Sequence, residues 1–148
     1  MSTGRIRPIA IGVIWNNGSL LVEHGFDSVK QKHFFRPPGG AIEFGERAVD
    51  ALRREFIEEL GAELIEPKLV TVIENIFDYE AQPHHELVFV FEARFKDSQL
   101  YERAEFEIQE VSVRTTASWK SLDELAGRAR PLYPDGLVAV LGGALEKQ

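Results

Sequence analysis

Three glutamates, Glu55, Glu58 and Glu59, are the residues of this sequence whose type and spacing could do chemistry. In a helix, at about 100° per residue, Glu58 lies roughly 60° to one side of Glu55 and Glu59 roughly 40° to the other. The three carboxylates would then share one side of the helix on adjacent turns. Clustered carboxylates are expected to bind a hard divalent cation, and such a cation usually serves to handle phosphate.

The surrounding residues predict the helix that this site needs, over residues 47–60. Its apolar stripe recurs at spacings of three and four and consists of Val49, Leu52, Phe56 and Leu60. Gly61 is a natural stop. Glu59 lies at the margin of the stripe, where a carboxylate loses hydration and needs a positive charge. Arg54, one turn before Glu58, supplies one such charge, and a metal ion is the simplest source of more. The alternative is a solvated acidic helix face, which is what most Glu-Glu pairs form.

A longer pattern, from Gly40 to Ala62, surrounds the glutamates. Its fixed positions are Gly40, Glu46, the pair Arg54-Glu55, the pair Glu58-Glu59 and Gly61. Such a pattern would match by chance in a chain of this size on the order of once in a million. The string resembles the Nudix box, at residues 40–62, and the chain resembles the Nudix hydrolase family. Phe56 and Ala62 stand where the family usually has aliphatic residues, while every charged position is intact.

The resemblance implies a fold and an activity. The fold would be a Nudix-type α/β/α sandwich with a central mixed sheet, formed by one domain over residues 1–148, in which the box is a loop-helix-loop motif. The reaction would be hydrolysis of a pyrophosphate bond in a nucleoside diphosphate linked to another group, with Mg²⁺ or Mn²⁺ as cofactor. Substrates of this kind are nucleoside triphosphates, dinucleoside polyphosphates, ADP-ribose and nucleotide sugars. The alternative is a Nudix-fold regulatory module that binds a nucleotide without turnover.

The resemblance also assigns roles, residue by residue. The implied metal ligands are the backbone carbonyl of Gly39 and the side chains of Glu55, Glu58 and Glu59. Arg54 would orient a box glutamate through a salt bridge, and Glu46 would bind through water or stabilise the loop. Glu58 is the preferred general base. A carboxylate from a later segment is the alternative, and the candidates there are Glu102, Glu105, Glu107 and Glu110.

Three further residues are weaker candidates for binding the substrate. Arg36, just before a double proline, could meet a phosphate or stack on a base, or it could simply cap a loop. Tyr79 lies 17 residues beyond the box, where relatives that cleave diadenosine polyphosphates tend to carry a tyrosine, but a strand aromatic explains it equally well. Glu86 follows two histidines at the start of a strand, and alternation would place neighbouring side chains on opposite faces.

Composition restricts the partners and the location. The 148-residue chain carries a net charge of −7 and no basic stripe, which speaks against a nucleic-acid polymer as partner. It contains no cysteine, so thiol chemistry is excluded. The N-terminus lacks an apolar signal segment and no run is long enough to span a membrane, so we expect a cytoplasmic protein without a membrane partner. A monomer and a homodimer are both compatible with the sequence.

The remaining pattern predicts an α/β sandwich. Expected strands are residues 9–15, 19–23, 68–79, 86–95 and 111–119, with a short extended piece at 33–35. Asn16-Asn17-Gly18 indicates a hairpin turn, which demands antiparallel pairing and hence a mixed sheet. Residues 25–32 are predicted to form a loop, and the pattern of residues 95–110 is ambiguous between helix, strand and loop. Ser121 and Glu124 indicate a short capped helix, and residues 136–147 a final helix.

Overall fold

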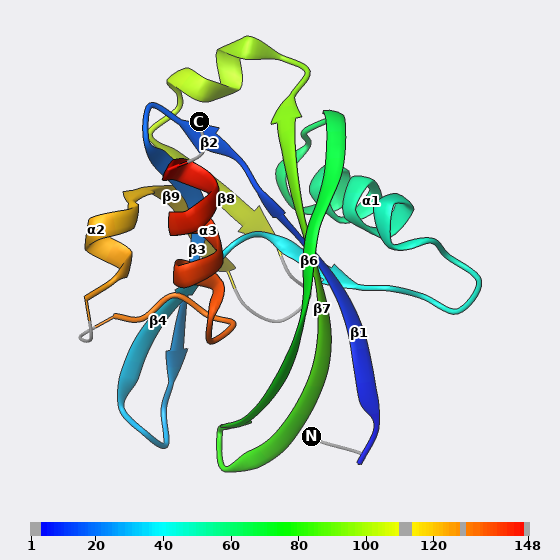
Figure 1. The fold of residues 1–148 in the computed structure, drawn as a ribbon, viewed down its shortest axis with the longest axis vertical. Coiled ribbons are helices and arrows are strands. Elements are labelled where there is room, and N and C mark those ends of the chain that lie inside the picture. The colour runs from blue at the N-terminus through cyan, green and yellow to red at the C-terminus, as the bar shows by residue number, and fades with distance from the viewer. Residues whose placement is uncertain (1–3, 110–113, 128–129, 147–148) are drawn as a thin grey trace.

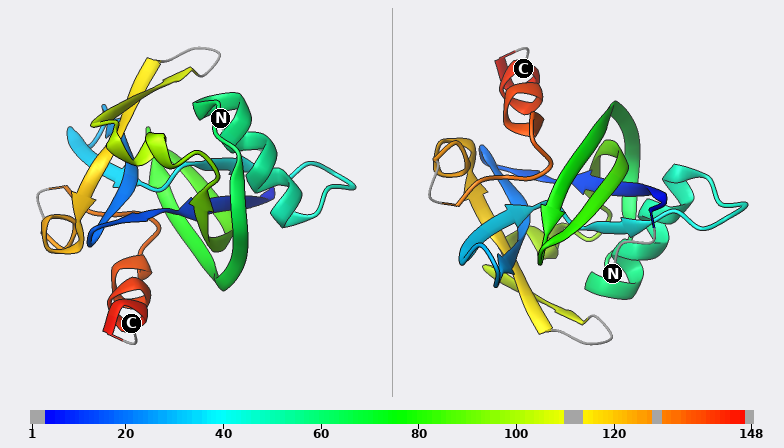
Figure 2. Two further views of the ribbon diagram at one scale, coloured as in Figure 1. Left: turned by 90° about the horizontal axis from the view of Figure 1, so that it is seen from above. Right: turned by 90° about the horizontal axis from the view of Figure 1, so that it is seen from below.

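The computed structural model describes residues 4–109, 114–127 and 130–146. Two β-sheets lie between helices (Figures 1 and 2). The first sheet has the strand order β5-β1-β7-β6 and the second the order β2-β3-β9-β8, with β4 paired to β3. The strands are β1 Ile6–Val13, β2 Trp15–Asn16, β3 Ser19–Asp27, β4 Lys32–Arg36, β5 Gly39–Ala41, β6 Leu64–Tyr79, β7 Gln82–Phe95, β8 Glu105–Gln109 and β9 Arg114–Ser121. The helices are α1 Ala48–Leu60, the 3₁₀ helix η1 Ser98–Glu102, α2 Leu122–Leu125 and α3 Leu137–Glu146.

The predicted mixed sheet is confirmed, and a second sheet that the sequence did not predict packs with it. In the first sheet β1 runs parallel to β7, while β5 pairs antiparallel with β1 and β6 antiparallel with β7. The hairpin at Asn17-Gly18 forms as expected, with positive φ at both residues, but it lies in the second, antiparallel sheet. The parallel β1–β7 pair, rather than this hairpin, therefore makes the first sheet mixed.

The predicted loop over residues 25–32 is wrong at its beginning, because β3 continues to Asp27. Gly25 pairs with Phe34 of β4, and a Cβ at Gly25 would collide with the Phe34 ring. A polar stretch interrupted by glycine therefore forms a strand here, because the aromatic ring of the neighbouring strand covers the glycine.

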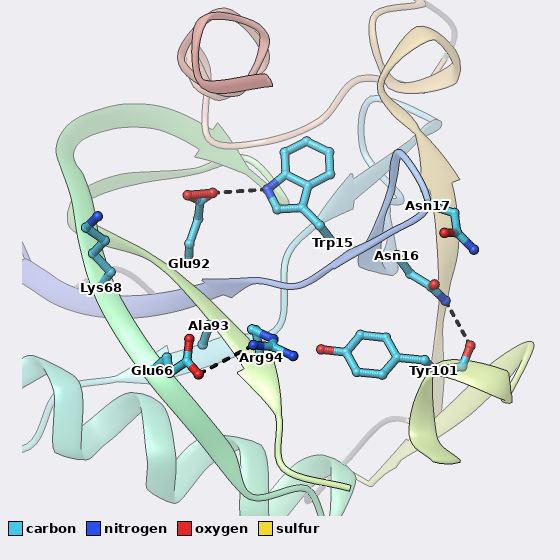
Figure 3. Close-up of a pocket in the computed structure, with 9 residues that line it drawn as sticks. All are labelled: Trp15, Asn16, Asn17, Glu66, Lys68, Glu92, Ala93, Arg94 and Tyr101. Atoms are coloured by element: carbon cyan, nitrogen blue, oxygen red, sulfur yellow. Dashed lines mark hydrogen bonds and ion pairs between the residues drawn. The ribbon is translucent and has the colours of Figure 1, made fainter. Parts of the chain in front are cut away.

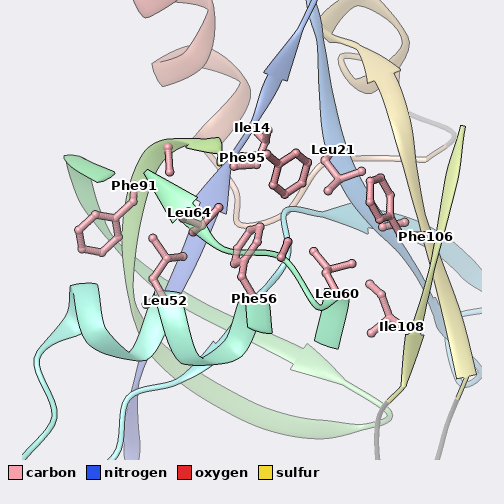
Figure 4. Packing of buried hydrophobic residues seen from close by; sticks show 14 of the residues in the cluster. Ile14, Leu21, Leu52, Phe56, Leu60, Leu64, Phe91, Phe95, Phe106 and Ile108 are labelled. Atoms are coloured by element: carbon pink, nitrogen blue, oxygen red, sulfur yellow. The ribbon is translucent and has the colours of Figure 1, made fainter. Parts of the chain in front are cut away.

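Helix α1 packs its apolar stripe against one face of the first sheet and against the second sheet (Figure 4). Leu52 and Phe56 are fully buried, and the Phe56 ring occupies the place where a Cβ at Gly12 of β1 would be. The helix ends at Gly61, whose φ of 64° is left-handed and whose N–H closes the last turn on the Ile57 carbonyl. This packing fixes which side of α1 is left to face solvent.

The other face of the first sheet is covered by the C-terminal part of the chain. Leu137 and Leu141 of α3 and Leu125 of α2 join a core with β1 and β7. Helices α1 and α3 thus lie on opposite sides of the strands, as Figure 2 shows, and the predicted α/β/α layering is confirmed. Among the described residues, no helix is both long and apolar enough to cross a membrane.

Candidate functional site

Arg54 is the centre of an ion-pair network on the solvent side of α1. Its Nε and Nη2 donate to the two carboxylate oxygens of Glu46, at 2.8 and 2.9 Å, in a bidentate pair. Nη2 also donates to the Ala41 carbonyl of β5, at 3.0 Å. The hydrogen bonds from Arg54 lower the pKa of Glu46 to about 2, and Glu46 in turn raises the pKa of Arg54 above its usual value. Arg54 therefore ties the loop before α1, the edge strand β5 and the helix together.

Two of the three predicted glutamates meet at this arginine. Nη1 of Arg54 donates to Glu55 Oε1 at 3.0 Å and to Glu58 Oε2 at 3.3 Å. The Glu58 side chain is 58% exposed, whereas that of Glu55 is 15% exposed. Glu59 is partly buried. The predicted salt bridge from Arg54 to a box glutamate is present, and its closest carboxylate is Glu46, eight residues earlier.

Gly40 lies directly beneath the carboxylate of Glu55. A Cβ at Gly40 would lie 2.5 Å from Glu55 Oε1 and 2.7 Å from Oε2, so the carboxylate of Glu55 would have to shift. Gly39 has φ of 154°, and a Cβ there would collide with the backbone of Ala10 and Ile11 in β1. Both glycines of β5 are thus required by close approach, Gly40 to a side chain and Gly39 to a neighbouring strand.

The donor chemistry at this place fits a hard divalent cation. Carboxylates of Glu55 and Glu58 share one nitrogen of Arg54, and the backbone of Gly40 is packed against the first of them. In the arrangement described, no three His, Asp or Glu side chains of residues 4–109, 114–127 and 130–146 gather closely enough to hold an ion.

A cavity of about 700 Å³ lies on the opposite face of the first sheet, between β1, β6 and β7 on one side and β3 and β4 on the other. Both sheets and the segment before α3 contribute to its lining. The residues that line it include Arg36, Phe34, Asn75, Phe77, Tyr79, His84, Glu86 and Tyr133. Its size is that of a ligand pocket.

The three weaker candidates from the sequence all line this cavity. Arg36 is 43% exposed at its side chain and lies 4.0 Å from the buried carboxylate of Glu23. Tyr79 makes an edge contact with Phe34 and donates a hydrogen bond to the Phe26 carbonyl, at 3.3 Å. Glu86 is only 9% exposed, and burial raises the pKa of its carboxyl, against the opposing effect of Arg36 and Arg7. The structure thus brings these three residues together, away from the box glutamates.

Sequence reasoning missed the partners of Glu86. Asn75 of β6 is directly opposite Glu86 of β7 in the sheet, and both side chains line the cavity. The signal that could have found Asn75 is its place between Ile73 and Phe77 in an alternating strand, where a polar residue occupies an inward position. His84 shares the cavity face with Glu86, whereas His85 does not line the cavity, as alternation predicts.

The later carboxylates proposed as alternative bases lie in different elements. Glu102 ends η1, and Glu105 and Glu107 lie on β8 with exposed side chains. Phe106 and Ile108, which alternate with them, are buried in the core beside α1. Glu110 lies outside the described residues. Within the described part of the chain, none of these three carboxylates forms an ion pair or a hydrogen bond with the Arg54 network.

The outer end of the cavity lies between two hairpin tips that are hydrogen-bonded to each other. Glu80, between β6 and β7, accepts hydrogen bonds from the backbone N–H and the hydroxyl of Ser28, at 2.8 and 2.6 Å. The side chain of Lys30 donates to the Asp78 carbonyl at 2.8 Å, and Asp27 accepts from the Glu80 N–H at 3.3 Å. These bonds fix the distance between the two sheets at the mouth of the cavity.

A second cavity, of about 510 Å³, lies at the other end of the first sheet (Figure 3). Trp15 Nε1 donates to Glu92 at 3.1 Å, and Asn16 donates to the Tyr101 carbonyl at 2.8 Å. Arg94 pairs with Glu66 at 3.4 Å. No residue that the sequence predicted as a metal ligand, catalytic residue or substrate-binding residue lines this cavity, so it is not the candidate site.

Comparisons with known proteins agree with this geometry. A family model described as NUDIX domain matches residues 5–137. A MutT NUDIX hydrolase structure from Burkholderia pseudomallei is 22% identical, with a TM-score of 0.67 over 93% of this chain and 97% of that one. A NUDIX hydrolase from Nitrosomonas europaea is 18% identical, with a TM-score of 0.69 over 97% and 90%. An ADP-ribose pyrophosphatase from Streptococcus suis is 18% identical, with a TM-score of 0.62 over 97% and 92%. At these identities the structures establish the fold.

Proposed function

Since this chain belongs to the NUDIX family of pyrophosphohydrolases, we propose that it hydrolyses the pyrophosphate bond of a nucleoside diphosphate linked to another group, in a divalent-metal-dependent reaction. The observation that carries the proposal is the Arg54 network, which gathers Glu55 and Glu58 beside the glycine strand β5. Substrate classes compatible with it are nucleoside triphosphates, dinucleoside polyphosphates, ADP-ribose and nucleotide sugars. One structural neighbour is described as an ADP-ribose pyrophosphatase, so ADP-ribose is among the substrates to be tested.

The residues that would hold Mg²⁺ or Mn²⁺ are Glu55, Glu58 and Glu59, with the backbone carbonyl of Gly39. A cation bound there supplies positive charge to the diphosphate and acidifies the attacking water. Arg54 keeps Glu55 in place over Gly40, because its guanidinium bonds at once to Glu46, Glu55 and the Ala41 carbonyl. Glu58, whose side chain is 58% exposed, is the carboxylate that would take a proton from water.

The cavity on the other face of the sheet is the proposed nucleoside site. Arg36, which lines it, is only four residues before Gly40, which touches Glu55. Four residues span at most about 14 Å of extended chain, on the scale of a nucleoside diphosphate. A substrate with its base in the cavity can therefore reach the box glutamates by passing over β5. We expect a small nucleotide rather than a nucleic-acid polymer as partner. The cytoplasmic location stays a prediction, and a monomer and a homodimer both stay open.

The test is release of phosphate or nucleotide from a panel of the four substrate classes, with Mg²⁺ and then Mn²⁺. Wild type is compared with Glu59→Gln and with the control Glu63→Gln, an exposed residue that pairs with Lys96 on the surface. We expect one class to be turned over by wild type and by the control, and nearly all turnover to be lost in Glu59→Gln. Near-normal turnover in a folded Glu59→Gln protein would refute its role as ligand. Silence of wild type on every class would favour a binding module without turnover.

A further inference from the structure

The end of the β3–β4 hairpin, which forms one wall of the cavity, is a ribbon of two strands (Figure 1). Strands β3 and β4 pair from Glu23 opposite Arg36 to Asp27 opposite Lys32. Within the described residues, β9 pairs with β3 only as far as Glu23, so β4 is the only strand that pairs with β3 beyond it. A two-stranded hairpin is marginally stable on its own. The ribbon therefore depends on side-chain contacts between its strands and with the rest of the protein.

Four aromatic rings connect the two strands of this ribbon. They belong alternately to β3 and β4, and their order along the ribbon is Phe26, His33, His24 and Phe35. The ring centroids are 4.6 Å apart for Phe26 and His33, 4.7 Å for His33 and His24, and 5.6 Å for His24 and Phe35. Cross-strand side-chain pairs of this kind stabilise a sheet. The two histidines lie at the centre of the row, so the row depends on their protonation state.

His24 and His33 are joined by a hydrogen bond between their rings. Nε2 of His24 and Nδ1 of His33 are 2.7 Å apart. One of these nitrogens has to carry the hydrogen and the other the lone pair, and only a neutral imidazole ring provides the lone pair. When both rings are protonated, both facing nitrogens are donors and no acceptor remains. The bond is then lost, and two positive charges lie next to each other.

Basic groups near His24 oppose its protonation. Lys120 of β9 and Arg130 of the segment before α3 act on its charge, while Glu23, its neighbour in β3, belongs to the other face of the strand by alternation. The pKa of His24 is lowered from 6.5, first by burial and then by His33, Arg130 and Lys120. The unfolded chain therefore binds this proton more readily than the folded protein. The stabilisation is full above pH 6.5 and is lost as pH falls through the lowered pKa.

We propose that the His24–His33 pair is an acid-sensitive contact that holds the β3–β4 hairpin together, and that protonation of both rings loosens this wall of the cavity. Each ring takes its proton from the solvent, and the N–H···N bond between the rings breaks. The remaining contacts of the hairpin tip, such as the bond from the Ser28 hydroxyl to Glu80, join exposed side chains and stabilise the tip only modestly. The device concerns access to the cavity and not the chemistry at the box glutamates, so it does not rest on the proposed function.

The experiment is hydrogen exchange of the intact protein at about pH 7.5 and about pH 5.5, on either side of the ordinary histidine pKa. Protection factors, which correct for the effect of pH on intrinsic exchange, are compared for peptides covering residues 24–35 and, as an internal reference, residues 48–60 of α1. The variant is His33→Asn, whose uncharged amide has an acceptor oxygen but does not titrate. The control is His85→Asn, on β7 outside the lining of the cavity.

We expect protection of residues 24–35 to fall on the order of 10-fold in acid, in wild type and in His85→Asn, while α1 keeps its protection. His33→Asn should have the same protection of the hairpin at both pH values. An unchanged hairpin in wild type, or an equal fall in His33→Asn, overturns the inference. Should His33→Asn not fold, an NMR titration of the wild-type histidines decides. The hairpin should then open with the midpoint of the His24 titration, below pH 6.5, and an opening that does not follow His24 overturns the inference.

Discussion

Replacing Gly40 with alanine tests whether the glycine strand positions the box. The new Cβ would lie 2.5 and 2.7 Å from the carboxylate oxygens of Glu55, whereas ordinary contacts begin at 3.4 Å. The β5 backbone cannot retreat easily, because Gly40 pairs with Ala10 and the Ala41 carbonyl is held by Arg54. The Glu55 carboxylate therefore has to move, by about 1 Å.

The size of the effect follows from what Glu55 touches. A shift of that size breaks its 3.0 Å hydrogen bond with Arg54, which at a partly exposed site costs about 1 kcal/mol. For a chain of this length that lowers Tm by about 2–4 °C. Misplacing a group at the reacting centre by about 1 Å costs on the order of 100-fold in rate. We therefore expect a folded protein with a small loss of stability and a large loss of kcat.

The assays are thermal unfolding and kcat on the substrate found by the panel. Gly143→Ala in α3 is the control, because its Cβ would have no neighbour within 4 Å, and alanine should leave activity unchanged and stability equal or higher. In a Glu55→Ala background the clash disappears, so Gly40→Ala should then cost no further stability. A Gly40→Ala enzyme with wild-type kcat, or one that loses the same stability in the Glu55→Ala background, would show that Gly40 does not act through Glu55.

Two further predictions concern stability. Burial raises the pKa of Glu86 in the folded protein, so the native state keeps a proton on this carboxyl at pH values where the unfolded chain has lost it. The contribution of Glu86 to the free energy of unfolding is therefore full below about pH 4.5 and is lost as pH rises through the raised pKa. Glu86→Gln should therefore unfold at a higher temperature than wild type at pH 7 to 8, with the difference vanishing below about pH 4.5, and a lower Tm at pH 7 would contradict this. Leu52→Ala, at a fully buried position, should cost about 2–5 kcal/mol in urea unfolding, and a loss below 1 kcal/mol would mean that α1 is not anchored there.

The sequence predicted the elements whose signals are local. Helix α1 begins one residue later than expected and ends at Leu60, because the apolar period and the left-handed Gly61 act within the helix itself. The capping box of Ser121 and Glu124 forms as predicted, for the same reason. The final helix, expected over residues 136–147, is found over Leu137–Glu146, and Lys147 lies outside the described residues.

Two strand boundaries were missed because the backbone departs from the local rules. Strand β6 was expected from Lys68 and begins at Leu64, since a register shift between Ile65 and Lys68 accommodates Pro67 next to the positive φ of Glu66. The expected strands left residues 80–85 as the connection between β6 and β7. It consists of Glu80 and Ala81, both with positive φ, a conformation that neither residue type indicates.

The candidate site divides in the same way. Glu55, Glu58 and Arg54 are close in sequence, so helix geometry was enough to bring them together. The cavity depends on the pairing of Asn75 with Glu86 and on the approach of a hairpin from the other sheet. These contacts join residues far apart in the chain, and no local pattern specifies them. Glu86 was singled out from its sequence neighbours, but its partner Asn75 was not.

The two halves of the site lie on opposite faces of one sheet, and this separation explains why the box does not reveal the substrate. The box glutamates are held by α1 and β5, whereas Asn75 and Glu86 of the cavity belong to β6 and β7. The strand order β5-β1-β7-β6 places β1 between the glycine strand and the β6–β7 pair. Residues 75 and 86 can therefore change without disturbing the Arg54 network. The residues proposed to bind the metal and those proposed to bind the substrate therefore belong to separate elements, so each set can be altered alone.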